Sequence, residues 1–135
     1  MIVSVEVPVI RGGWLIQCVD SVLQQTSSNW VLSLLWDEGD SLAHDILREI
    51  EATHHPKIQV HFGKKLGIAR ARQFLTERSH GELILPLDDD DLLEPTAVAS
   101  FLSAALERPW AGILRARREF VDDRRTYRNG RLVSV

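Results

Sequence analysis

The spacing of apolar residues along this chain changes repeatedly between a period of two, typical of strands, and a period of about 3.6, typical of amphipathic helices. Strand-like patterns occupy residues 2–9, 30–36, 58–62, 83–87 and 110–121. Helical patterns lie between them at residues 14–25, 41–50, 67–75 and 95–106. Strands that alternate with helices in this order predict a three-layer α/β fold, in which a mainly parallel sheet with right-handed crossovers carries helices on both faces.

Residues that favour turns and caps mark several of the expected element ends. We expect the first strand to stop at Pro8, Ser41 to cap the second helix and Pro95 to begin the fourth helix. The dipeptide Asn129-Gly130 predicts a hairpin turn after the fifth strand.

The composition is typical of a packed globular protein. A chain of 135 residues with 44% apolar and 26% charged side chains is expected to form a single domain, residues 1–135. Its one cysteine, Cys18, cannot form an internal disulfide, which favours a reducing compartment. No run approaches the roughly 20 apolar residues of a membrane span. We therefore expect a cytoplasmic protein, whose attachment to the inner face of a membrane would need further segments or partners.

The charged residues are distributed unevenly. Residues 1–114 carry 9 Lys and Arg against 16 Asp and Glu, whereas residues 115–131 carry 7 arginines against 3 acids. Such an arginine-rich end favours contact with an anionic partner, so a non-catalytic binding module is one alternative function. The interleaved acids and the net charge of −3 argue against nucleic acid as that partner. The same end carries the apolar residues Val121, Tyr127 and Leu132 and is a candidate homodimer surface.

Polar segments follow three of the expected strands. Ile10-Arg11 comes after the first strand, Asp37-Glu38-Gly39-Asp40 after the second, and Asp88 to Asp91 after the fourth. Ligands of doubly wound parallel sheets bind beyond the carboxyl ends of the strands. We therefore expect the three segments to meet in one crevice, which is the candidate binding site.

The acidic run Asp88 to Asp91 directly follows a buried strand. Four adjacent carboxylates repel one another unless a cation neutralises them. In an extended segment Asp88 and Asp90 point to the same side. Mg²⁺ or Mn²⁺ fits such a place, because these ions prefer oxygen ligands and are often held by one or two carboxylates together with phosphates. The alternative is a solvated acidic turn that caps the helix beginning at Pro95.

A basic segment, residues 63–72, supplies the positive charge that a diphosphate needs. Lys65 and Arg72 are its better candidates, and Gly67 stands where a helix begins and its free N–H groups favour anions. The alternative is an ordinary exposed basic helix face. A Mg²⁺-dependent phosphotransfer domain is another alternative function, but it predicts an acidic residue directly after the first strand, where this chain has Ile10-Arg11.

In their order along the chain, these motifs resemble those of the family 2 glycosyltransferases of the GT-A type. The resemblance runs from Val3 to about Pro95: VSVEVPVI for the opening strand, WLIQCVDSVLQQTSSNWVLSLLWDEGDS for the next helix and acidic strand end, GIARARQFL for the helix with its glycine and arginine, and HGELILPLDDDDLLEP for the strand with the DxD signature. The resemblance implies the nucleotide-sugar-binding portion of such an enzyme, with a Rossmann-like half of the fold and a role in polysaccharide biosynthesis.

By that resemblance, Asp37 or Glu38 would contact the nucleotide base, Asp88 the ribose, and Asp90 the Mn²⁺ or Mg²⁺ that bridges the donor's diphosphate. Arg72 would lie near the diphosphate. The expected metal ligand is Asp90, and the expected nucleotide-sugar site comprises Pro8, Ile10, Arg11, Asp37, Glu38, Lys65, Arg72, Asp88 and Asp89. The implied partners are a nucleoside-diphosphate sugar and an acceptor hydroxyl of a glycan, lipid or protein.

The resemblance also implies a part of the enzyme that these motifs do not include. Family members continue beyond the DxD strand into an acceptor-binding half, which carries the aspartate that serves as general base in an inverting displacement. Asp122 and Asp123 follow the fifth strand too early for that role. We therefore expect the general base beyond Val135, and we expect these 135 residues to be an incomplete enzyme that transfers little sugar alone.

Overall fold

The computed structural model describes the backbone of residues 1–121 and 127–134 and the side chains of residues 1–117. Contacts within the chain define two compact units, Met1–Leu102 and Ser103–Val135. Helix α4 (Ala97–Glu107) begins in the first unit and ends in the second. The other elements of the first unit are β1 (Val3–Val9), α1 (Leu15–Leu23), β2 (Trp30–Asp37), α2 (Ser41–Ala52), β3 (Ile58–Gly63), α3 (Ile68–Glu77) and β4 (Leu83–Pro86).

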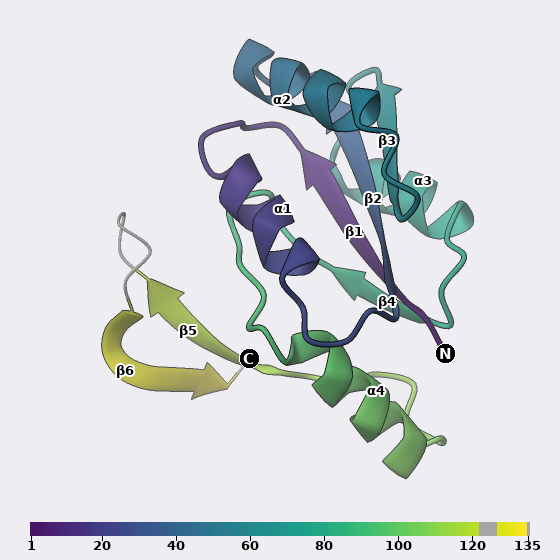
Figure 1. Ribbon diagram of the computed structural model, residues 1–135, viewed down its shortest axis with the longest axis vertical. Coiled ribbons are helices and arrows are strands. Elements are labelled where there is room, and N and C mark those ends of the chain that lie inside the picture. Colours follow the sequence, from purple (N-terminus) through teal and green to yellow (C-terminus); the bar gives the residue numbers. More distant parts are fainter. Residues whose placement is uncertain (122–126, 135) are drawn as a thin grey trace. The chain divides into compact units, whose positions relative to one another are not determined.

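The strands of the first unit form one parallel sheet in the order β3-β2-β1-β4 (Figure 1). Strand β1 is central: it pairs with β2 along Val3–Val9 and with β4 along Val3–Glu6. Helices α1 and α2 cover one face of the sheet and α3 covers the other (Figure 1). The predicted three-layer α/β fold with a parallel sheet is therefore confirmed.

The side chains of β1 alternate between two different environments, as a strand covered on both faces requires. Its valines pack in the main core, which lies under α1 and α2 and also contains Leu32 and Leu34 of β2. A smaller apolar cluster on the other face joins Leu35 of β2 to Ala71 and Leu75 of α3.

The sheet face beneath α3 is partly polar. Ser4, Glu6 and Ser33 are buried there, with 0%, 2% and 6% of their surfaces exposed. Buried polar groups need hydrogen-bond partners to offset the loss of water. The central strands therefore have an apolar face toward α1 and α2 and a face toward α3 that combines polar and apolar side chains.

Three element boundaries differ from the expectation. Helix α4 begins at Ala97, and Pro95 lies in the turn before it. Strand β1 continues through Pro8 to Val9. The Glu6 carbonyl accepts a hydrogen bond from the Leu87 N–H, so the backbone of Glu6 faces β4. The nitrogen of Pro8, two residues later, faces the same side, but beyond the end of β4. The N–H that proline lacks therefore costs no ladder bond. Helix α2 begins at Ser41, and its cap is the preceding Asp40, whose side chain accepts a hydrogen bond from the Ala43 N–H at 2.8 Å.

The second unit contains β5 (Arg117–Val121) and β6 (Tyr127–Ser134), which pair as an antiparallel hairpin. The expected strand over residues 110–121 was too long, because residues 110–116 form no strand. The apolar side chains of Trp110 and Ile113 in this segment are 79% and 82% exposed. The expected turn at Asn129-Gly130 is wrong, because both residues lie within β6 and the strands are connected through residues 122–126, outside the described residues. Turn propensity is local, and strand pairing overrides it here.

Candidate functional site

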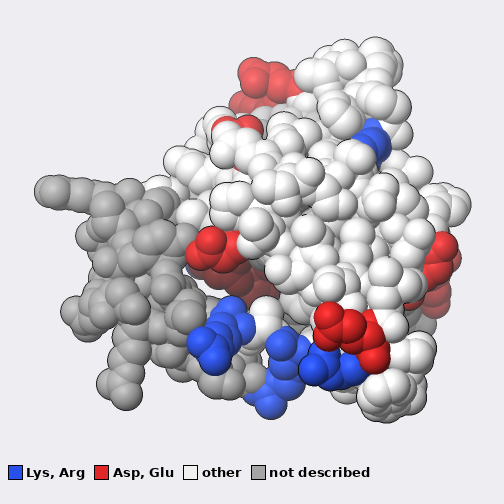
Figure 2. Space-filling view, turned by 60° about the horizontal axis from the view of Figure 1, so that its bottom comes forward, with Lys and Arg blue, Asp and Glu red and all other residues white. Residues whose placement is uncertain are grey.

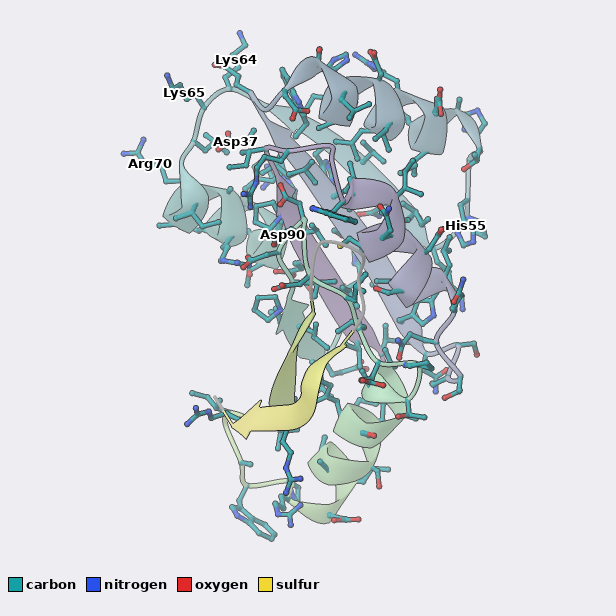
Figure 3. The ribbon with its side chains drawn as sticks, turned by 90° about the vertical axis from the view of Figure 1, so that its left-hand side faces the viewer. Asp37, His55, Lys64, Lys65, Arg70 and Asp90 are labelled. Carbon is teal, nitrogen blue, oxygen red and sulfur yellow. The ribbon has the colours of Figure 1, made fainter. Side chains whose placement is uncertain are left out.

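Three strand ends lie side by side at the carboxyl edge of the parallel sheet. Strand β1 separates β2, which ends at Asp37, from β4, which leads into Asp88. Figure 3 shows Asp37 and Asp90 on the same end of the sheet. The expected convergence of the segments after the first, second and fourth strands is confirmed, and it follows from parallel pairing on both sides of β1.

Asp89 joins the acidic run to the end of β1. Its side chain is only 4% exposed, and its Oδ2 accepts hydrogen bonds from the backbone N–H groups of Ile10 at 2.9 Å and Arg11 at 3.0 Å. Hydrogen bonds from N–H groups to a carboxylate are shorter and stronger than those between neutral groups. Asp89 therefore fixes the acidic run against the first strand, whatever else it contacts.

Asp40 makes a second junction, which the sequence pattern did not single out. Its carboxylate accepts hydrogen bonds from the Gly12 N–H, at 3.1 and 3.2 Å to its two oxygens, and from the Ala43 N–H. Its own N–H donates to the Ile10 carbonyl at 2.8 Å. The loop after β1 is thus attached to the first turn of α2. The only sequence signal for this role was an acidic residue before a helix.

Asp37 makes the third junction. It is 8% exposed, and its two carboxylate oxygens accept the N–H groups of Leu66 at 2.6 Å and Gly67 at 2.9 Å. Gly67 has a φ of 83°, a conformation that glycine adopts without steric cost. The basic segment before α3 is therefore held at the end of β2. Because a carboxylate has about four lone-pair sites, Asp37 retains acceptor capacity for a ligand.

The remaining acids of the run form a cluster. One carboxylate oxygen from each of Asp88, Asp90 and Asp91 lies within 4.8 Å of the others. Opposite oxygens around a Mg²⁺ ion lie about 4.2 Å apart, given Mg–O distances near 2.1 Å, so a small closure would allow these three carboxylates to share an ion. The all-oxygen donor set suits Mg²⁺ or Mn²⁺. The sequence pattern singled out Asp88 and Asp90 but not Asp91. The segment is not extended as expected: it turns, and the Asp91 N–H donates to the Asp88 carbonyl at 3.1 Å.

Two arginines offset the charge of this cluster. Arg72 Nη2 lies 2.6 Å from Asp88 Oδ1, and Arg11 Nη2 lies 3.2 Å from Asp90 Oδ2 and 3.5 Å from Asp89 Oδ1. Arg72 comes from α3 and Arg11 from the loop after β1, so the pairs connect separate parts of the site. Cations and carboxylates together can accommodate both a divalent ion and the phosphates of a ligand.

The other expected residues lie around these junctions. Pro8 is buried within β1, Ile10 is 51% exposed, and Glu38 is exposed with a φ of 50°. The side chain of Lys65 extends outward beyond Asp37, beside Lys64 and Arg70, rather than toward Asp90 (Figure 3). The structure thus brings Arg11 and Arg72 to the acidic cluster and leaves Lys65 at the periphery.

Glu6 lies beneath this edge, on the face covered by α3. It accepts hydrogen bonds from the hydroxyl groups of Thr76, at 2.9 Å, and Ser4, at 3.4 Å. Burial raises the pKa of the Glu6 carboxyl, and these hydrogen bonds and the charge of Arg72 partly oppose the rise. The ionised form of Glu6 is therefore less favourable in the folded chain than in the unfolded chain.

The raised pKa predicts how Glu6 affects stability as the pH changes. Between the unfolded value of 4.5 and the raised folded value, the folded chain binds more protons, so its stability falls as the pH rises through this window. We expect Glu6→Gln to remove this part of the decline. Urea unfolding of both chains across the acid range tests it, and parallel stability curves would contradict it.

The close packing of Gly39 makes a second prediction. A Cβ at Gly39 would lie 2.5 Å from the Ile10 Cα and carbonyl oxygen, whereas a Cβ at Gly13 would meet nothing within 4 Å. Backbone atoms cannot move aside as a flexible side chain can. We expect Gly39→Ala to destabilise the chain by about 1–3 kcal/mol and Gly13→Ala by less than about 0.5 kcal/mol, measured by urea unfolding. Equal losses would show that the junction between the two loops is not tightly packed.

Solved structures of transferases share this fold. The chain superimposes on S. aureus TarS 1–349 in complex with UDP-GlcNAc with a TM-score of 0.69 and 15% identity, over 90% of this chain and 40% of that one. It superimposes on the mannosyltransferase PcManGT from Pyrobaculum calidifontis, in complex with GDP-Man and Mn²⁺, with a TM-score of 0.65 and 17% identity, over 90% of this chain and 36% of that one. These likenesses identify the GT-A transferase fold.

Sequence comparison identifies the family. The chain is 32% identical to chondroitin synthase from Escherichia coli over 98 residues, which are 72% of this chain and 14% of that protein. It spans only 13–14% of the curated relatives that it matches. The family model described as Glycosyl transferase family 2 matches residues 4–133. This chain therefore belongs to glycosyl transferase family 2.

Proposed function

We propose that this chain is the donor-binding portion of a metal-dependent inverting glycosyltransferase and that it binds a nucleoside-diphosphate sugar. The observation that carries the proposal is the cluster of Asp88, Asp90 and Asp91, which lies at the carboxyl edge of the sheet with the guanidinium groups of Arg11 and Arg72 beside it. Family membership favours this function over a Mg²⁺-dependent phosphotransfer domain.

Asp90 is the principal ligand that we propose for Mn²⁺ or Mg²⁺, with Asp88 and Asp91 close enough to contribute. When bound, such an ion supplies positive charge that offsets the negative charge developing on a leaving diphosphate. The presence of GDP-Man and Mn²⁺ together in the PcManGT structure supports this assignment. The all-oxygen donor set of the cluster supports it independently.

Arg72 and Lys65 are proposed to contact the diphosphate. Arg72 is already at the acidic cluster, through its 2.6 Å contact with Asp88, and a guanidinium can bind a phosphate through two parallel hydrogen bonds. Lys65 extends outward, and its flexible stem would have to turn toward the sheet edge to reach a phosphate (Figure 3). Arg11, which is 63% exposed, is a further cation for the donor.

The nucleoside is proposed to lie across the ends of β2, β1 and β4. Asp37 or Glu38 would contact the base, Asp88 the ribose, and Pro8 and Ile10 would form the adjoining surface. Asp89 would support the site from below through its hydrogen bonds to the Ile10 and Arg11 N–H groups. The structures of TarS with UDP-GlcNAc and PcManGT with GDP-Man support a nucleotide-sugar ligand of this general kind.

In the complete reaction, an acceptor hydroxyl attacks the anomeric carbon of the donor sugar and the bond to the diphosphate breaks, with inversion at that carbon. A general base takes the hydroxyl proton, and the nucleoside diphosphate leaves. We propose that this base is supplied from outside residues 1–135. Asp122 and Asp123, considered for the role from the sequence, lie outside the described residues.

We further propose that the C-terminal end of the chain contacts an anionic partner or a second copy, and that the protein is cytoplasmic. Figure 2 shows Lys and Arg side chains beside Asp and Glu on one face of the molecule, so positive and negative charges are mixed there. Of the arginines expected to contact an anionic partner, Arg115 and Arg117 are exposed, and the side chains of the others lie outside the described part of the chain. The side chains of Val121, Tyr127 and Leu132, expected at a homodimer surface, lie outside it as well. In the described part of the chain, none of the helices has the length and apolar character needed to cross a membrane. The cytoplasmic location stays a prediction.

The acidic cluster predicts metal-dependent donor binding. Without an ion, its carboxylates repel a diphosphate, so UDP, GDP or dTDP should bind on the order of tenfold to a hundredfold more tightly with Mn²⁺ than with a chelator. Asp90→Asn should abolish that difference, whereas Asp45→Asn, at a residue of α2 that is 80% exposed, should keep it. Calorimetric titration measures both effects. If none of the nucleotides binds at millimolar concentration, the donor-site assignment fails.

The proposed diphosphate contacts predict a different response. Arg72→Ala should weaken nucleotide binding about tenfold or more, with Mn²⁺ and with a chelator, because a charged hydrogen-bond donor is lost in both conditions. Lys65→Ala should have the same direction and a smaller effect, since an exposed, flexible cation contributes less. Titration in both conditions tests the pair. Unchanged affinity of Arg72→Ala would remove this residue from the donor site.

Transfer activity gives a separate prediction. A general base typically accelerates such a step by about 10²- to 10⁴-fold, and loss of the acceptor surface also removes the benefit of orientation. We therefore expect the 135-residue chain to bind a donor but to transfer little sugar in a radiolabelled-donor assay. Robust transfer to a defined acceptor by this chain alone would contradict the proposed location of the base.

A further inference from the structure

Glu6 is a buried carboxylate with no part in the donor site proposed above. It is 2% exposed and lies in the central strand, opposite Ser33 of β2 and Pro86 of β4. Placing a carboxylate there has a cost in free energy unless the charge is compensated. An apolar residue would occupy the same position without that cost.

The contacts of Glu6 lead toward α3. Its Oε2 accepts a hydrogen bond from the Thr76 hydroxyl at 2.9 Å. Thr76 and Arg72 are four residues apart on α3 and therefore share one face of the helix, one turn apart. Burial raises the pKa of Glu6, and the positive charge of Arg72, on the same face of α3 as Thr76, opposes that rise.

The described residues satisfy only part of the hydrogen-bonding capacity of the Arg72 guanidinium at the sheet edge. Its Nη2 reaches Asp88 at 2.6 Å, but its Nη1 is buried and has no hydrogen-bond partner among the described residues. Two-thirds of the side chain is covered, since 33% of it is exposed. Charges interact more strongly where water is excluded, so a carboxylate beneath α3 can stabilise this guanidinium without direct contact.

We propose that Glu6 is a positioning residue whose carboxylate, beneath α3, holds the Arg72 guanidinium at the sheet edge for the diphosphate of the donor. The inference rests on the proposed function for the identity of the ligand. It gives Glu6 opposite effects on fold and function: the buried charge lowers the stability of the fold, and the same charge raises the affinity of the site through Arg72.

The test is a double-mutant cycle on nucleotide affinity. Glu6→Gln, Arg72→Gln and the double variant are titrated with UDP, GDP and dTDP in Mn²⁺, and the nucleotide that binds the unchanged chain most tightly is used throughout. Glu6→Gln should weaken binding about tenfold in the Arg72 background and have no effect once Arg72 is replaced. A purely structural role would weaken binding equally in both backgrounds, and that result would overturn the proposal.

Two further variants control the cycle. Ser33→Ala alters another buried polar side chain on the same sheet face and should leave affinity unchanged. Thr76→Val removes the hydroxyl that contacts Glu6, and should weaken binding in the same direction as Glu6→Gln. If Glu6→Gln does not fold, Thr76→Val with and without Arg72→Gln provides the cycle, and equal effects of Thr76→Val in both backgrounds would overturn the proposal.

A second readout separates this proposal from the proposed function. Urea unfolding of the same four chains measures the coupling between Glu6 and Arg72 without any ligand. If no nucleotide binds the unchanged chain, the donor-site assignment fails, and the unfolding cycle then decides the pairing: non-additive changes support it and additive changes overturn it. If nucleotides bind and Arg72→Gln weakens binding while Glu6→Gln does not, the positioning role alone fails.

Discussion

Carboxylates that accept backbone N–H groups hold the candidate site together. Asp89 accepts from the segment after β1, and Asp37 from the segment before α3. Asp40 joins the loop after β1 to the first turn of α2. Backbone N–H groups beyond strand ends and at helix starts have no ladder partners, so an anion placed among them is stabilised by several short bonds. The segments that carry the other site residues depend on these three side chains.

The buried polar face beneath α3 extends this arrangement inward. Glu6 lies in the same strand as the valines of the main core, but on the opposite face, with its carboxylate among hydroxyl groups and under the influence of Arg72. An apolar cluster of Leu35, Ala71 and Leu75 packs α3 against the same face. The third helix is thus attached to this face by both apolar and polar contacts.

Most of the fold could be predicted from the periods of the apolar residues. The alternating valines of β1 and the apolar stripe of α1 record burial over many residues, so one unfavourable residue does not obscure the pattern. Signals carried by one or two residues were less reliable. Asp40, and not Ser41, caps α2. Asn129-Gly130 lies within β6 and not in a turn. In both places, contacts with neighbouring segments determine the local structure.

The sequence by itself determined that acidic segments follow β2 and β4 and that a basic segment precedes α3, and parallel pairing required them to share one edge. Only the tertiary structure decided which of these acids accept backbone N–H groups and which form the acidic cluster. Asp89 and Asp91 are neighbours in one run, but the first is buried against the Ile10 and Arg11 N–H groups and the second joins the cluster of Asp88 and Asp90. All four residues of the run are aspartates, so their side chains are chemically identical. Their roles differ because the N–H groups and guanidinium groups that they meet come from segments distant in the sequence, and their positions are fixed only when the strands and helices have packed.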